Sequence, residues 1–254
     1  MEPRGAVAVI TGGCTGIGRA TALALAGSGA TGIVAGWSRS ADDAATLVPE
    51  AEALGARTLA ERADVTDDAA VRALAATALE RFGRVDILVN NAATTRAVPE
   101  DDLDALGDED WHAVLDVNVV GAFRCARAFA PALRASGGAL VNVASIAGFR
   151  AGGSSLAYGA SKAALLQLTR DLASALAPRV RVNAVAPGTV ATRWQTGLHG
   201  EEGFAARARA ERATVPLRAT PGPEHVAQAI LGLLRMDLVT GEAVIVDGGK
   251  HIRY

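Results

Sequence analysis

The sequence has little cysteine, no long apolar run and no excess of charge of either sign, and each absence excludes a class of protein. Two cysteines in 254 residues cannot form a disulfide framework, which indicates a reducing compartment. No run approaches the roughly 20 apolar residues that a membrane helix needs. Lys+Arg 25 and Asp+Glu 27 give a net charge of −2, which excludes a strongly basic nucleic-acid-binding protein.

What the sequence does contain indicates a globular protein. Apolar residues make up 50% of the chain and charged residues 20%, so a sizeable core is expected rather than disorder. The N-terminal segment MEPRGAVAVITGG lacks a signal-peptide pattern, because its short apolar run leads directly into a glycine turn. We therefore expect a cytoplasmic protein with no membrane partner and no nucleic-acid partner.

Strand-like and helix-like segments alternate along the chain, with no linker that would divide it. The pattern predicts one α/β domain over residues 1–254, a Rossmann-type doubly wound parallel sheet of about seven strands with helices on both faces. The expected strands are apolar on successive residues, as in strands covered on both faces: Ala6–Ile10, Gly32–Gly36, Arg57–Ala60, Asp86–Asn90, Ala139–Ala144, Val180–Ala186 and Ala243–Val246. The expected helices are Thr21–Ala26, Ala41–Leu54, Asp67–Phe82, Trp111–Leu133, Ala157–Leu176 and Pro223–Leu234.

One stretch, Thr192–Pro216, interrupts this rhythm. It lacks the dense apolar pattern of the core and contains the isolated apolar residues Trp194, Leu198 and Phe204. Long insertions in compact domains are usually lids or binding loops, so we expect a substrate lid at about residues 192–216 with a partly apolar pocket beneath it. A pair of surface helices is the alternative.

A glycine-rich turn lies between the first expected strand and the first expected helix. Its spacing is Gly-x3-Gly-x-Gly, and glycines at such a turn let the backbone approach a pyrophosphate while free N–H groups of the helix face the anion. An ordinary strand–helix turn is the alternative. Cys14 lies inside the turn, where we interpret it as a small residue whose oxidation would block cofactor binding. The candidate cofactor-binding residues of this turn are Gly12, Thr15, Gly16, Ile17 and Gly18.

Tyr158 and Lys162 are four residues apart in an expected helix and therefore share one face. A nearby cation favours the phenolate form of a tyrosine and lowers its pKa. Lys162 and Lys250 are the only lysines among 25 basic residues, which suggests that position 162 needs a compact ammonium rather than a guanidinium. Together with Ser145 at a strand end, the pair is a candidate acid–base unit. A surface lysine beside a half-buried tyrosine is the alternative.

These motifs together resemble the short-chain dehydrogenase/reductase family, and in particular proteins similar to 3-oxoacyl-carrier-protein reductase. Besides the glycine turn and Tyr158-x3-Lys162, the chain has Asn90-Asn91-Ala92-Ala93 after the fourth strand and Asp247-Gly248-Gly249 after the last. Ala93 stands where the family has glycine. The motifs occur in the family's order from Val7 to Gly249.

The resemblance implies an oxidoreductase that transfers a hydride between nicotinamide and a carbonyl or secondary alcohol of a small or acyl-type substrate. It implies that Tyr158 moves the proton, Ser145 hydrogen-bonds the substrate oxygen, Lys162 also binds the nicotinamide ribose, and Asn118 holds a water in a proton relay. A catalytically silent dinucleotide-sensing module, or an epimerase or dehydratase on the same fold, are the alternatives. No metal is expected, because histidine and cysteine lack ligand spacing.

The resemblance also implies that Asp64 and Val65 contact the adenine of the cofactor. For Asp64, a helix cap is the alternative interpretation. The remaining contacts to the adenosine ribose and the nicotinamide half are implied for Asn90, Asn91, Ala92, Tyr158, Lys162, Pro187, Gly188, Val190 and Thr192.

The end of the second strand bears on the choice between NADP(H) and NAD(H). An NAD-dependent protein of this fold needs a carboxylate there to accept a hydrogen bond from the ribose 2′-hydroxyl. The chain instead has Ser38, Arg39 and Ser40, which suit a phosphate. The first acids, Asp42 and Asp43, fall in the next helix, where Ser40 and Asp43 resemble a capping pair. We therefore expect NADP(H), with NAD(H) as the alternative.

The two long expected helices, Trp111–Leu133 and Ala157–Leu176, are rich in alanine and leucine. Their apolar surface exceeds what one sheet face can cover, and small residues allow close helix–helix contact. We therefore expect a homotetramer or homodimer, and the aromatic Tyr254 at the end of the chain suggests the same.

Overall fold

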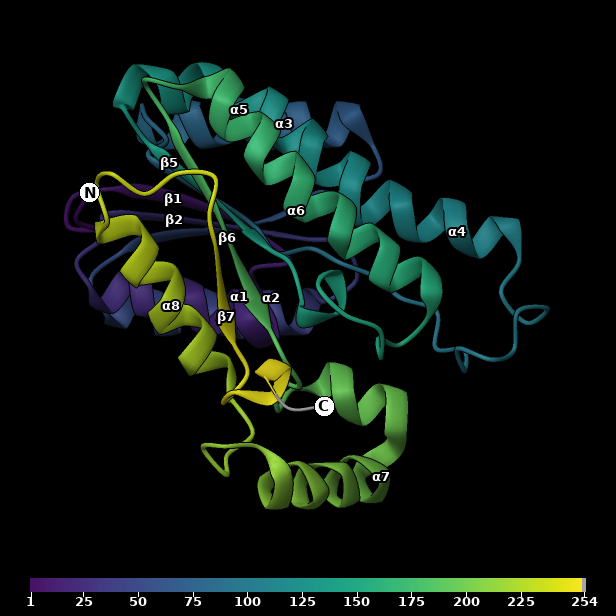
Figure 1. Cartoon of the computed structure of the whole chain (residues 1–254). Coiled ribbons are helices and arrows are strands. Elements are labelled where there is room, and N and C mark those ends of the chain that lie inside the picture. Colours follow the sequence, from purple (N-terminus) through teal and green to yellow (C-terminus); the bar gives the residue numbers. More distant parts are fainter. Residues whose placement is uncertain (253–254) are drawn as a thin grey trace.

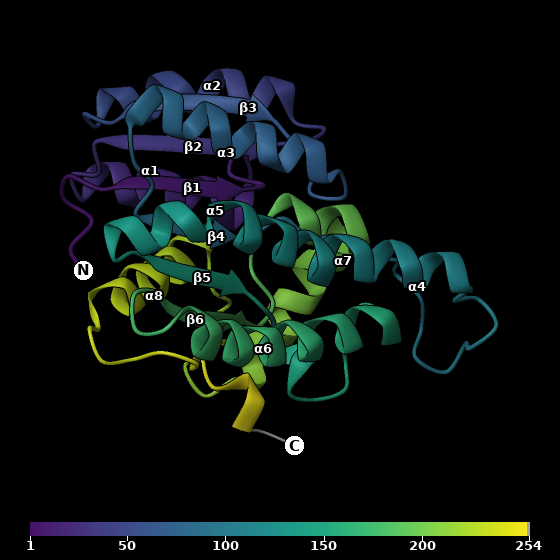
Figure 2. The ribbon, with the colours of Figure 1, turned by 90° about the horizontal axis from the view of Figure 1, so that it is seen from above.

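The computed structural model describes residues 1–252, which form a parallel sheet between two layers of helices (Figure 1). The strand order is β3-β2-β1-β4-β5-β6-β7, and every pair of neighbours is parallel (Figure 2). The strands are β1 (Val7–Thr11), β2 (Gly32–Trp37), β3 (Arg57–Arg62), β4 (Ile87–Asn90), β5 (Ala139–Val143), β6 (Arg181–Pro187) and β7 (Ala243–Val246). This confirms the predicted Rossmann-type fold.

Helices α1, α2 and α8 cover one face of the sheet, and α3, α5 and α6 cover the other (Figure 1). None of the helices within residues 1–252 is long and apolar enough to cross a membrane. The helices are α1 (Gly16–Gly27), α2 (Ala41–Ala53), α3 (Asp68–Phe82), α4 (Asp108–Leu115), α5 (Ala122–Ser136), α6 (Leu156–Leu176), α7 (Arg193–Thr214) and α8 (Pro223–Arg235).

The core of the protein lies at the inner strands, which have helices on both faces of the sheet. Every residue of the inner strands β1, β4 and β5 is buried, because helices pack on both faces, and this explains their continuous apolar runs. The edge strand β3 is only half-buried, and it begins and ends with the exposed residues Arg57 and Arg62. Charged residues on an edge strand oppose pairing with another chain.

Two segments differ from the expected helices. The long helix expected over Trp111–Leu133 is divided by a π-helical turn at Asp116–Gly121, which separates α4 from α5. The irregular stretch after β6 is largely helical, but α7 is broken at Gly200, where φ is +69°. The structure therefore contains the helix pair that was the alternative description of residues 192–216.

Candidate functional site

A cavity of about 960 Å³ lies outside the carboxyl ends of the strands. Strands β2 and β3 lie on one side of β1 and strands β4 to β7 on the other, so the order of strand addition reverses between β1 and β4, and ligands of open α/β sheets bind in the crevice at such a point. The cavity brings together predicted residues from six strand ends and two helices: Gly12, Thr15, Gly16, Ile17, Ser38, Arg39, Asp64, Val65, Asn91, Ala92, Ser145, Tyr158, Lys162, Pro187, Gly188, Val190 and Thr192.

The glycine turn has the geometry that an anion site requires. Gly12 and Gly16 have φ of +60° and +50°, a region that side chains disfavour, so the backbone itself faces the cavity. Thr15 is the N-cap of α1, but its side chain makes no capping hydrogen bond. The N–H groups at this helix end are consequently available to a phosphate, which they and the helix dipole would stabilise. The turn therefore fits a dinucleotide pyrophosphate.

Gly18 has a packing role. A Cβ at Gly18 would overlap the carbonyl oxygen of Gly12 and the side-chain amide of Asn91, so only glycine lets the turn fold onto α1. Gly18 thus lies behind the cavity wall rather than on it. The same amide of Asn91 donates to the carbonyl oxygens of Thr11 and Gly12, at 3.0 Å each, and holds the turn against β4.

Cys14 packs into the core beneath the glycine turn, as a small residue can. Its side chain is buried, and burial raises the pKa of the thiol to about 11. Oxidation proceeds through the thiolate, which is scarce at neutral pH for such a thiol. Oxidation of Cys14 is therefore expected to be slow, and its effect on cofactor binding stays a prediction.

Ser145, Tyr158 and Lys162 meet at the inner end of the cavity. Ser145 follows β5, and its Oγ accepts a hydrogen bond from the N–H of Ala147 at 3.2 Å and also hydrogen-bonds Tyr158. Lys162 Nζ donates to the carbonyl oxygen of Val143 at 2.9 Å and lies 5.6 Å from the centroid of the Tyr158 ring. The first two turns of α6 thus present a phenol and an ammonium to the same space.

The protonation of this group differs from the expectation that Lys162 lowers the pKa of Tyr158. Burial raises the pKa of Tyr158 above its usual value and outweighs the lowering effect of the Ser145 hydrogen bond. Burial also lowers the pKa of Lys162 to about 8. In the chain alone, Tyr158 therefore carries its proton at neutral pH, which is the form that can donate to a carbonyl oxygen.

Asn118 lies in the π-helical turn, behind the cavity. Its Oδ1 accepts from the N–H of Thr94 at 2.8 Å, and its Nδ2 donates to the Thr94 carbonyl oxygen and to Ser161 Oγ. The side chain therefore ties the loop after β4 to α6, close to Tyr158. Such π-turns often occur at functional sites. A water relay through Asn118 stays a prediction.

At the β3 end of the cavity, Asp64 is not the helix cap. Asp67 caps α3 instead, because its Oδ1 accepts from the N–H groups of Ala69 and Ala70. Hydrogen bonds from the N–H and hydroxyl of Thr66 hold the pKa of Asp64 below its usual value, so it is ionised.

The predicted cofactor-binding residue Asn90 is buried behind the cavity, where it donates to Asn142 Oδ1.

The predicted capping pair of Ser40 and Asp43 is wrong. Ser40 is the N-cap of α2 but makes no side-chain capping hydrogen bond. Asp43 instead lines the cavity together with Ser38, Arg39 and Ser40, and its carboxylate accepts from Arg193 at 2.6 Å. Sequence reasoning missed both residues of this ion pair, because acids in a first helical turn are common and Arg193 is distant in sequence.

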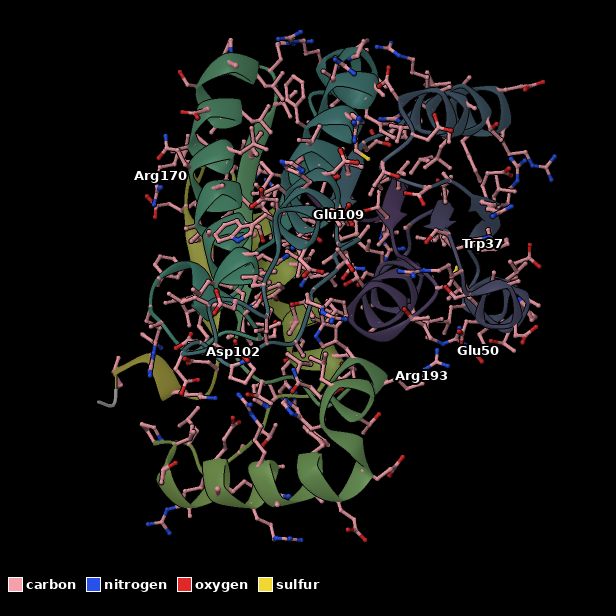
Figure 3. All side chains as sticks on the ribbon, turned by 90° about the vertical axis from the view of Figure 1, so that its right-hand side faces the viewer. Trp37, Glu50, Asp102, Glu109, Arg170 and Arg193 are labelled. Carbon is pink, nitrogen blue, oxygen red and sulfur yellow. The ribbon has the colours of Figure 1, made fainter. Side chains whose placement is uncertain are left out.

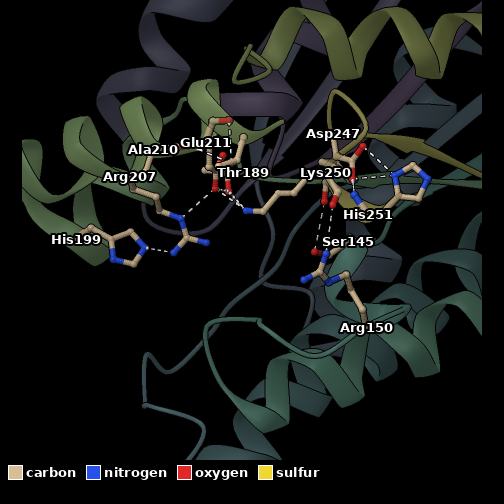
Figure 4. A network of polar contacts seen from close by, with 12 residues as sticks. Ser145, Arg150, Thr189, His199, Arg207, Ala210, Glu211, Asp247, Lys250 and His251 are labelled. Carbon is tan, nitrogen blue, oxygen red and sulfur yellow. Dashed lines mark hydrogen bonds and ion pairs between the residues drawn. The ribbon is translucent and has the colours of Figure 1, made fainter. Parts of the chain in front are cut away.

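The second half of α7 is fixed to the body of the protein (Figure 4). Glu211 accepts a hydrogen bond from Thr189 at 2.6 Å and forms an ion pair with Lys250. The first half, before the break at Gly200, carries Trp194 over the cavity, where its ring centroid lies 6.4 Å from that of Tyr158. Leu198 and Phe204 are not in the cavity lining that residues 1–252 form. Their expected pocket role is therefore not supported.

Among residues 1–252, no cluster of three or more histidine, cysteine, aspartate or glutamate side chains could hold a metal ion.

Known proteins resemble the chain over almost its whole length. The family model described as Enoyl-(Acyl carrier protein) reductase matches residues 12–251. A ketoacyl reductase assigned to the granaticin polyketide synthase of Streptomyces violaceoruber is 44% identical, over 98% of both chains. The 3-oxoacyl-acyl-carrier-protein reductase of Thermotoga maritima is 37% identical, over 99% of this chain and 100% of the other.

Solved structures show the same similarity. A short-chain dehydrogenase from Burkholderia cenocepacia, crystallised in complex with NADP, superimposes with a TM-score of 0.87 at 35% identity and covers 98% of this chain and 99% of its own.

Proposed function

The chain belongs to the short-chain dehydrogenase/reductase family of oxidoreductases, and from this premise we propose that it is an NADP(H)-dependent ketoreductase of the cytoplasm. Its substrate would be a small or acyl-type carbonyl compound, as the names of the two relatives suggest. The observation that carries the proposal is the position of Tyr158 at the cavity between Ser145 and Lys162, where desolvation raises the pKa of the phenol. The buried free thiols Cys14 and Cys125 agree with a reducing compartment.

The proposed chemistry assigns a task to each residue of this group. Bound NADPH would supply the hydride. Ser145 and Tyr158 would donate hydrogen bonds to the substrate carbonyl oxygen, and the Tyr158 proton would pass to that oxygen as negative charge develops on it. The Lys162 ammonium would stabilise the resulting phenolate and bind ribose hydroxyls.

The test of this function is reduction of a panel of ketones and β-ketoacyl thioesters, followed by the loss of NADPH absorbance. Turnover of at least one carbonyl compound is expected. If no carbonyl compound is reduced and no alcohol is oxidised with either dinucleotide, the chain is not a ketoreductase. The comparisons place it among oxidoreductases, so we do not retain the dinucleotide-sensing module.

NADP(H) is the proposed cofactor because Arg39 lines the cavity at the end of β2, between Ser38 and Ser40. Arg39→Ala is expected to lower kcat/KM for NADPH about tenfold and to leave that for NADH nearly unchanged, since the guanidinium would contact only the 2′-phosphate. The measurement is kcat/KM for both dinucleotides with one accepted substrate. Equal NADPH kinetics in the variant and the wild type would contradict this assignment.

We also propose that residues 192–216 act as a lid. The hydrogen bond of Glu211 to Thr189 holds the second half of α7 in place, and the break at Gly200 separates that half from the first. The part that closes over the cavity is therefore the short segment from Thr192 to His199. The proposed moving part is thus shorter than the lid over residues 192–216 that the sequence indicated.

A homotetramer or homodimer is the proposed assembly. Val120 in the π-helical turn before α5, Phe123 at the start of α5 and Leu156 at the start of α6 are 40%, 41% and 39% exposed, which suits an interface between helices of two copies. Tyr254 lies outside the described residues. Light scattering at micromolar concentration is expected to give a multiple of the 25.8 kDa chain mass. A monomeric mass would refute the proposal.

A further inference from the structure

An ion pair spans the cavity at its cofactor-selecting end. Arg193, in the first turn of α7, donates through Nη2 to Asp43 Oδ1 in the first turn of α2, at 2.6 Å. The two residues are 150 positions apart, and both line the cavity. Figure 3 shows Arg193 at the side of α7 that faces α2, the helix that also carries Glu50. The pair thus joins the lid segment to the wall of the cofactor site.

Asp43 places a carboxylate where the choice of dinucleotide is made. It shares this end of the cavity with Ser38, Arg39 and Ser40. A free carboxylate here would accept a hydrogen bond from the 2′-hydroxyl of NAD(H) and repel the 2′-phosphate of NADP(H). The proposed preference for NADP(H) therefore requires that the charge of Asp43 be compensated.

The neighbouring cations Arg19, Arg39 and Arg62 are not the ones that pair with the Asp43 carboxylate. Arg19 forms an ion pair with Glu50 at 2.7 Å, and it reaches Asp43 only at the backbone carbonyl oxygen, at 3.3 Å. The charges of Arg39 and Arg62 help to lower the pKa of Asp64, and the Arg39 guanidinium stays available to a phosphate in the cavity. Arg193 is therefore the cation whose guanidinium meets the Asp43 carboxylate.

We propose that Arg193 determines cofactor specificity by neutralising Asp43. This inference rests on the proposed NADP(H) function and adds a residue to it. With the ion pair formed, a 2′-phosphate meets the hydroxyls of Ser38 and Ser40 and the Arg39 guanidinium without an opposing charge. With the pair open, Asp43 favours a 2′-hydroxyl. The lid segment, by carrying Arg193, thereby takes part in selecting the dinucleotide.

The side chains of the pair are partly accessible, at 71% exposure for Arg193 and 28% for Asp43. Ion pairs of this kind contribute little to folding stability, so both can be replaced without unfolding the chain. Their electrostatic effect on a phosphate nearby is larger, since phosphate carries close to two negative charges. The variants to compare are Arg193→Gln, Asp43→Asn and the double variant.

The measurement is the Kd of NADPH and of NADH, from the fluorescence of the reduced nicotinamide in titrations without substrate. Arg193→Gln is expected to weaken NADPH binding about tenfold and to leave NADH binding within about twofold. In the double variant, NADPH affinity should return to within about twofold of the wild-type value, because the unpaired carboxylate is gone. Arg209→Gln, an exposed arginine of the same helix outside the cavity, is the matched control and should change neither Kd.

Two results would overturn the inference. If Arg193→Gln weakens NADPH binding equally with and without Asp43→Asn, Arg193 acts on the phosphate directly and not through Asp43. If it weakens NADPH and NADH binding equally, or weakens neither, the pair does not select the cofactor. A wild-type preference for NADH would instead contradict the proposed function, while the change in the ratio of the two Kd values would still decide the role of Arg193.

Discussion

Tyr158→Phe is expected to reduce kcat by about a hundred- to ten-thousand-fold, the usual contribution of a general acid. The phenyl ring keeps the packing of the tyrosine and removes only the oxygen that carries the proton. Burial keeps this proton in place in the chain alone, because it raises the pKa of Tyr158. The measurement is kcat with saturating NADPH and one accepted ketone.

Dinucleotide affinity serves as the control for this variant. Because the glycine turn and the β2 and β3 ends of the cavity are unchanged, the Kd of NADPH should stay within about threefold of the wild-type value. A variant that binds NADPH normally and is inactive would place Tyr158 in the chemical step. Retention of a third of the wild-type activity would show that Tyr158 is not the acid.

Lys162→Arg is expected to cost about a hundredfold in kcat although it conserves the charge. Lys162 is 2% exposed, and its Nζ lies 2.9 Å from the Val143 carbonyl oxygen, so the site is enclosed. A guanidinium is larger and planar, and it cannot occupy the position of the ammonium without displacing its neighbours. NADPH affinity should also fall, because the same group is proposed to bind the ribose. The measurements are kcat and the Kd of NADPH.

Lys250→Arg provides the matched control, since Lys250 is the one other lysine in the sequence. Its ammonium pairs with Glu211 outside the cavity, where an arginine can keep the ion pair. This variant should retain activity within about twofold. If Lys162→Arg were equally active, the compact ammonium would have no special role, and the argument from the scarcity of lysine would fail.

The local pattern of the sequence was sufficient for the fold and for many of the residues that line the cavity. β2 was expected at Gly32–Gly36 and runs over Gly32–Trp37. A strand of this kind can be predicted because a short apolar run is visible in consecutive residues. The pairing of Tyr158 with Lys162 was also predictable, since residues four apart share a helix face. Ser145 was predicted from the motifs of the family, because helical spacing alone does not connect it to Tyr158 and Lys162.

The sequence by itself therefore determined the parallel sheet, the glycine turn and the residues that meet at the strand ends. The tertiary structure alone decided the sign of the pKa shift of Tyr158, because burial depends on every element packed around the phenol. It also decided that Asp43 faces Arg193 rather than capping α2. Charges act over a few ångströms in space, and the fold, rather than any neighbour in sequence, brings the first turns of α7 and α2 close enough for these two side chains to meet.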